Sequence, residues 1–122
     1  MKETNKSIIE WHEQTFPDAT LEGQIKKFYE EYGEFLAEVE LNDTTAYHFE
    51  LADCFIVACG VCRFSLETAT KFFSQVYKLL EEYDITDECF VDDVRMKMQT
   101  NRNRKWSIGK GNYQHISEEN KE

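Results

Sequence analysis

Apolar side chains recur every three or four positions along most of this chain, which is the period of an amphipathic α-helix. The clearest stripe joins six residues between positions 21 and 39, namely Leu21, Ile25, Phe28, Tyr32, Phe35 and Val39. A different pattern occurs at 51–61, where "LADCFIVACGV" is apolar on nearly every side. This segment is therefore predicted to be a central helix that the others surround.

Capping residues and helix breakers divide the chain into five predicted helices. The expected spans are about 4–15, 21–41, 44–64, 66–83 and 87–105. Pro17 ends the first helix, Asp18 or Thr20 can cap the second, and Ser65 caps the fourth. The sequence therefore predicts a single all-α domain of 122 residues, a bundle of about four to five helices. An irregular tail is expected over about 107–122.

The composition of the chain argues against a membrane span, stable nucleic-acid binding and a zinc site. There is no apolar run of about 18 residues and no signal-peptide pattern at the start, so we expect a cytoplasmic protein without a membrane span. A net charge of −10 argues against stable nucleic-acid binding. The four cysteines are expected to be reduced thiols, and the Cys59-x-x-Cys62 pair lacks the further ligands of a zinc site.

Charge is distributed unevenly along the chain. No acidic residue lies between Val94 and Ser117, whereas six cationic residues do: Arg95, Lys97, Arg102, Arg104, Lys105 and Lys110. An acidic body with a basic C-terminal segment favours a phosphate-bearing ligand held between the two parts.

Two carboxylate pairs are the first candidates for chemistry. Glu31, Glu34 and Glu38 share one face of the second predicted helix, and Lys27 lies one turn earlier on that face. On its own, this pattern is also typical of a solvated acidic face.

Glu50 and Asp53 share a face of the third predicted helix, which later apolar residues continue. The alternative explanations are a polar helix end or an ion pair with Arg63 or Lys71. If the second and third helices are antiparallel neighbours, however, E-x-x-E lies opposite E-x-x-D and four carboxylates converge. Such a cluster needs a cation, because like charges 4 Å apart repel by about 4 kcal/mol at an effective dielectric near 20.

Ligands that are all oxygen favour a hard cation, Mg²⁺ first and Mn²⁺ next. A di-iron site is not expected, because bundle di-iron sites use Glu-x-x-His on two helices. His12, His48 and His115 occupy no such position and are expected to be surface or helix-packing residues.

A cationic stripe lies on the fifth predicted helix. Lys97, Asn101, Arg104 and Lys105 follow one another at i, i+4, i+7 and i+8. They could form a phosphate clamp with an amide that reaches a base or a sugar. The alternatives are a solvated face or cations that favour a helix C-terminus.

Taken together, these segments resemble the MazG-like all-α nucleoside triphosphate pyrophosphohydrolases. The resemblance rests on "EEYGE" (30–34), "ELAD" (50–53), "KMQTNRNRKW" (97–106) and the N-terminal "WHEQTFPDATLEGQIKKFYEE" (11–31). It covers about residues 8–116 and is closest to the small single-domain members of phages and bacteria. It implies a helical homodimer or homotetramer that cleaves nucleoside triphosphates between the α- and β-phosphates, in nucleotide-pool control or house-cleaning.

The resemblance also implies roles for individual residues. The Mg²⁺ ligands would be Glu31, Glu34, Glu50 and Asp53, and the nucleotide contacts would be Lys97, Asn101 and Arg104, with Lys27 and Lys105 as further substrate-binding candidates. Glu34 is the candidate for orienting the attacking water. Glu38 could be a ligand, a water-orienting base or plain surface. Two other functions stay open, a non-catalytic acidic partner-binding protein and a hydrolase of a different pyrophosphate bond.

Overall fold

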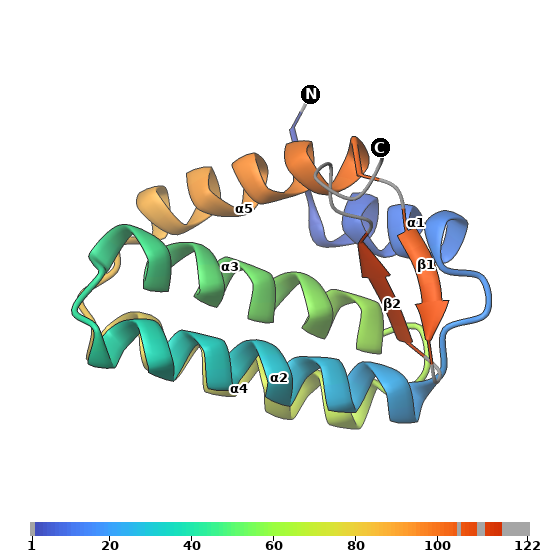
Figure 1. The fold of residues 1–122 in the computed structure, drawn as a ribbon, viewed down its shortest axis with the longest axis horizontal. Helices are drawn as coiled ribbons and strands as arrows, with labels where there is room; N and C mark the ends of the chain where they lie inside the picture. The colour runs from blue at the N-terminus through green and yellow to red at the C-terminus, as the bar shows by residue number, and fades with distance from the viewer. Residues whose placement is uncertain (1, 105, 110–111, 116–122) are drawn as a thin grey trace, which may run out of the picture.

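The computed structural model describes residues 2–104, 106–109 and 112–115, and within this range it confirms the predicted helical bundle (Figure 1). Five α-helices are followed by a two-stranded β-hairpin. In chain order the elements are α1 (Asn5–Thr15), α2 (Leu21–Glu40), α3 (Thr44–Val61), α4 (Leu66–Glu82), α5 (Asp87–Arg102), β1 (Trp106–Gly109) and β2 (Asn112–His115).

Every helix begins after a residue whose side-chain oxygen accepts a hydrogen bond from the backbone N–H three positions later. These residues are Thr4, Thr20, Asp43, Ser65 and Thr86. Each cap satisfies a backbone donor that has no partner inside its helix. Of the two predicted candidates for capping α2, the structure uses Thr20, and the predicted cap of α4 is confirmed.

Two helices end earlier than predicted. Helix α3 ends at Val61 instead of about residue 64. The backbone N–H groups of Arg63 and Phe64 then bond to oxygens only three residues earlier, and the extended Ser65 (φ −155°, ψ 108°) caps α4. Helix α5 ends at Arg102 instead of 105, and the Asn103 side chain then donates a hydrogen bond to the backbone oxygen of Gln99.

Helix α3 is the centre of the bundle, as its sequence predicts. It packs against α1, α2, α4 and α5, and Figure 1 shows it between α5 on one side and α2 and α4 on the other. Its buried side chains lie all around the helix, among them the free thiols Cys54 and Cys59. Within the described ranges, no helix combines the length and apolar character that crossing a membrane requires.

The β-hairpin corrects the expectation of an irregular tail. Strands β1 and β2 pair antiparallel, with Trp106 opposite His115 and Gly109 opposite Asn112. The sequence does contain a hairpin signal: two short runs flank a two-residue segment that ends in glycine ("WSIGKGNYQH"). Strand β2 contacts α2, so the hairpin lies against the bundle at the end where α1 also lies (Figure 1).

Candidate metal centre and cleft

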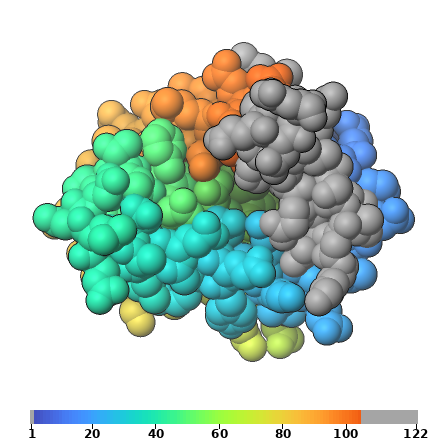
Figure 2. Space-filling view, in the orientation of Figure 1, coloured from blue at the N-terminus to red at the C-terminus, as the bar shows by residue number. Residues whose placement is uncertain are grey.

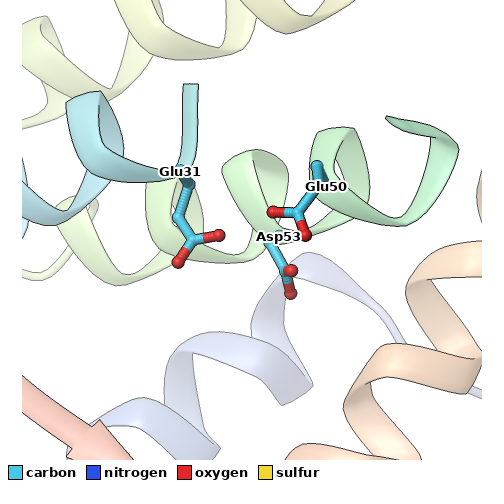
Figure 3. Close-up of side chains that lie close together, drawn as sticks. All are labelled: Glu31, Glu50 and Asp53. Carbon is cyan, nitrogen blue, oxygen red and sulfur yellow. The ribbon is translucent and has the colours of Figure 1, made fainter. Parts of the chain in front are cut away.

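Three carboxylates from two helices converge beside the centre of the bundle. Glu31 projects from α2, and Glu50 and Asp53 project from α3 toward the same space (Figure 3). One ligand oxygen from each residue lies within 4.8 Å of the others. Glu31 is only 8% exposed, and Glu50 and Asp53 are partly buried. A hard divalent cation takes ligands of this kind, so the three residues could hold a metal ion.

The packing of α2 and α3 sets this arrangement. The two helices run antiparallel (Figure 1), and the turn between them contains Asn42, whose φ of 60° reverses the chain after α2. Phe28 and Phe35 are almost fully buried and hold α2 against the core. Because Glu31 lies three residues after the first and four before the second, it is drawn inward beside them. The prediction that the two acidic motifs face each other is confirmed for Glu31, Glu50 and Asp53.

Burial and mutual repulsion disfavour the ionised forms of these three acids, as their raised pKa values indicate. Burial, and then the neighbouring charges of Asp53, Glu31 and Glu34, raise the pKa of Glu50 to about 8. Burial also raises the pKa of Glu31 and of Asp53. The Oε2 atom of Glu50 is buried without a hydrogen-bond partner. Unpaired buried polar atoms are costly, so this oxygen is a natural ligand for a cation.

Two lysines supply part of the missing positive charge. The Nζ atom of Lys97, from α5, lies 3.0 Å from Oδ2 of Asp53, and Nζ of Lys27 lies 3.4 Å from Oε1 of Glu31. Both side chains of the Lys97–Asp53 pair are about four-fifths buried. The predicted alternative of a solvated cationic face is therefore wrong for Lys97.

The other predicted alternative was an ion pair between the acids of α3 and either Arg63 or Lys71. The structure contradicts it. Arg63 donates its hydrogen bonds to the C-terminal end of α1, and Lys71 pairs with Glu67 on its own helix. Glu50 and Asp53 are thus left facing the space that they share with Glu31.

Because the pKa of Glu50 is raised on folding, the apo protein should lose stability as the pH rises. The folded protein retains this proton up to about pH 8, whereas the unfolded chain releases it near 4.5. We expect the free energy of unfolding, measured by urea denaturation in EDTA, to fall between these values. Glu50→Gln should flatten the fall, whereas the exposed control Glu40→Gln should not. Parallel curves for wild type and Glu50→Gln would contradict this explanation.

The three acids lie on the wall of a cleft of about 680 Å³. Figure 2 shows this face, with α3 (green) recessed between α2 (cyan) and α5 (orange). The predicted substrate-binding residues Lys27, Lys97, Asn101 and Arg104 all line the cleft. Asn101 is buried, and its Oδ1 accepts a hydrogen bond of 3.4 Å from Nη1 of Arg104. One cleft thus brings acids and cations together, at a size typical of small-molecule sites.

The remaining predicted site residues are less central. Glu34 lines the cleft, and burial and the charge of Glu31 raise its pKa, but it is not part of the tight three-acid group. Its predicted place among the metal ligands is therefore not supported by the geometry. Glu38 is not among the residues that line the cleft, so its predicted catalytic role lacks geometric support as well. Lys105 lies outside the described residues.

Sequence reasoning missed the other end of the cleft. Trp11, His12 and Phe16 from the α1 region and Gln24 from α2 line it as well. His12 was expected at the surface or in helix packing; it is only 3% exposed and packs against α3 at Gly60. A buried histidine beside a glycine carries no local signal, because the pair is 48 positions apart in the sequence.

No family model, curated protein or solved structure matches this chain. The site is therefore interpreted from its own residues and their geometry.

Proposed function

We propose that this protein is a Mg²⁺-dependent nucleoside triphosphate pyrophosphohydrolase, which gives a nucleoside monophosphate and pyrophosphate. One observation carries the proposal. A three-carboxylate group and the cations Lys27, Lys97 and Arg104 line the same cleft. A polyphosphate needs both, because its charge is neutralised by a metal ion and by basic side chains. The sequence resemblance to MazG-like enzymes agrees with this proposal.

Mg²⁺ is the cation that the donor set fits best, with Mn²⁺ as the second choice. All three donors are carboxylate oxygens, which suit hard ions, and Oε2 of Glu50 is buried without a partner. When bound, the ion would supply Lewis-acid chemistry to the triphosphate and favour ionisation of water. The residues that would hold it are Glu31, Glu50 and Asp53.

The other cleft residues would orient the substrate and the attacking water. Lys97 and Arg104 reach the cleft from the C-terminal half of α5 and its end, and Lys27 reaches it from α2. Their charges would hold the β- and γ-phosphates and stabilise the negative charge that develops on the leaving pyrophosphate. Glu34 is exposed at the edge of the acid group and would accept the proton of the water that attacks the α-phosphorus.

We include self-association in the proposal, as a homodimer or homotetramer. Helices α2 and α4 carry exposed apolar side chains, among them Tyr29, Leu36, Leu66 and Tyr77. In such an assembly, a second copy of the chain would cover side chains of this kind. The acid group and its lysines come from one chain, so this part of the site does not depend on a second copy.

The proposed activity predicts release of pyrophosphate from nucleoside triphosphates. The measurement is a screen of canonical and damaged nucleoside triphosphates with Mg²⁺, in which pyrophosphate is detected directly. Release of orthophosphate instead would indicate hydrolysis of a different pyrophosphate bond. No metal-dependent release from any of them would leave the acidic partner-binding function in its place.

A further inference from the structure

The two ends of the cleft differ in chemistry. The charged end carries the acid group and the lysines, whereas the other end is lined by Trp11, Phe16 and Ile56. The Trp11 and Phe16 rings meet edge to face, with centroids 5.2 Å apart. Two polar residues are set into this apolar end, His12 at 3% exposure and Gln24 at 4%.

Hydrogen bonds determine which atoms these two polar residues present. Nη1 of Arg63 lies 2.8 Å from Nδ1 of His12. A guanidinium can only donate, so Nδ1 must accept and the histidine proton must be on Nε2. Nε2 lies 3.1 Å from Oε1 of Gln24 and therefore donates to it. Burial and the Arg63 charge keep this histidine neutral, with its pKa lowered to about 4.

The carboxamide of Gln24 is fixed as a result. Its oxygen is engaged by His12, so its NH₂ group is directed away from the histidine, and the residue lines the cleft. Arg63 also anchors this network to the backbone. Nη1 of Arg63 donates to the backbone oxygens of His12 and Phe16, which ties the end of α1 to the end of α3.

Gly60 completes this support. A Cβ atom at Gly60 would lie 2.5 Å from Nε2 of His12, so only glycine lets the ring rest against α3. The position of the histidine, and through it that of Gln24, is therefore fixed by the backbone of two helices.

From this arrangement we propose that the apolar end of the cleft is a nucleobase subsite in which Gln24 sets the base preference. Its NH₂ group donates to an acceptor on the edge of the base, while the Trp11 and Phe16 rings form an apolar wall that the base packs against. His12 and Arg63 are positioning residues, because they orient the amide without contacting the base. This inference rests on the proposed function, which places the triphosphate at the charged end.

The test compares kcat/KM for the canonical nucleoside triphosphates in wild type and Gln24→Glu. A glutamate still accepts from His12 but has no NH₂ group to donate. The ratio of kcat/KM between the preferred base and the others should fall about tenfold or more, because a buried acceptor on the base loses its partner. Gln24→Met, which adds no charge, should reduce the same ratio. Gln14→Glu, at an exposed position on α1, should leave it unchanged.

Inorganic tripolyphosphate separates base recognition from general damage, since it has no base. Its inhibition constant should be unchanged in Gln24→Met and in His12→Phe, although both variants lose base discrimination. A merely structural role for His12 would instead weaken tripolyphosphate and all nucleotides together, and would overturn the positioning role.

The inference is overturned, with the proposed function intact, if wild type hydrolyses nucleoside triphosphates but shows no base preference, or if Gln24→Glu and Gln24→Met keep the wild-type ratio. If wild type hydrolyses none of them, the proposed function and the inference both fail.

Discussion

Asp53→Asn and Glu50→Gln should each lower the rate of nucleoside triphosphate hydrolysis by about 100-fold or more. Each substitution removes one charged oxygen from the three-acid group while it preserves the size of the side chain. Losses of this size are typical when one electrostatic contact to a reacting phosphate or its metal is removed. The measurement is kcat/KM for pyrophosphate release at saturating Mg²⁺.

The folded state should survive both substitutions. Glu50→Gln should make the apo protein more stable at neutral pH, because the raised pKa of Glu50 shows that the folded protein disfavours its charge. Far-UV circular dichroism and thermal unfolding would separate lost chemistry from lost structure. Asp92→Asn, on the exposed side of α5, is the matched control and should retain wild-type activity. Wild-type rates for Asp53→Asn or Glu50→Gln would show that the acid group is not the reaction centre.

Removal of divalent cations should abolish activity and lower the melting temperature. EDTA should stop hydrolysis, and added Mg²⁺ should restore it. A ligand at 100 times its Kd stabilises the folded state by about 2.7 kcal/mol. For a domain of this size, that corresponds to a rise in Tm of roughly 10 °C. The measurement is a pair of thermal unfolding curves, one in EDTA and one in excess Mg²⁺.

Variants of the acid group and of Lys97 test whether Mg²⁺ binds at this site. The double variant Glu50→Gln with Asp53→Asn should show no Mg²⁺-dependent rise in Tm. Lys97→Met should show a larger rise than wild type, because the lysine 3.0 Å from Asp53 no longer supplies part of the positive charge. An equal rise in wild type and in the double variant would place the binding of Mg²⁺ elsewhere on the protein.

Most of the fold could be predicted because its determinants are local. The apolar period of the helices and the capping residues Thr20 and Ser65 can be recognised in short stretches of sequence. The ends of α3 and α5 could not be placed as well, since they depend on where the next element begins. The hairpin after α5 is hard to predict because its strands are only four residues long and the glycines in this region are also typical of irregular structure.

The residues of the candidate site also differ in whether the sequence could predict them. Glu31, Glu50 and Asp53 could be predicted because acidic pairs on or beside apolar helix faces stand out in a sequence. Lys97 could be predicted because it begins a cationic stripe on α5. The apolar end of the cleft could not be predicted. His12, Gln24 and Arg63 are brought together by the packing of α1 against α2 and α3, and no spacing in the sequence links them. Glu34 and Glu38 share the i, i+3, i+7 pattern with Glu31, but burial and packing select Glu31 alone for the tight group.

One measurement tests the central claim most directly. Each nucleoside triphosphate is incubated with the protein and Mg²⁺ in ¹⁸O-labelled water, and the products are identified by phosphorus NMR. Attack at the α-phosphorus predicts a nucleoside monophosphate that carries the label and an unlabelled pyrophosphate. Label in pyrophosphate or in orthophosphate, or no turnover with Mg²⁺, would contradict the claim that this cleft cleaves the bond between the α- and β-phosphates.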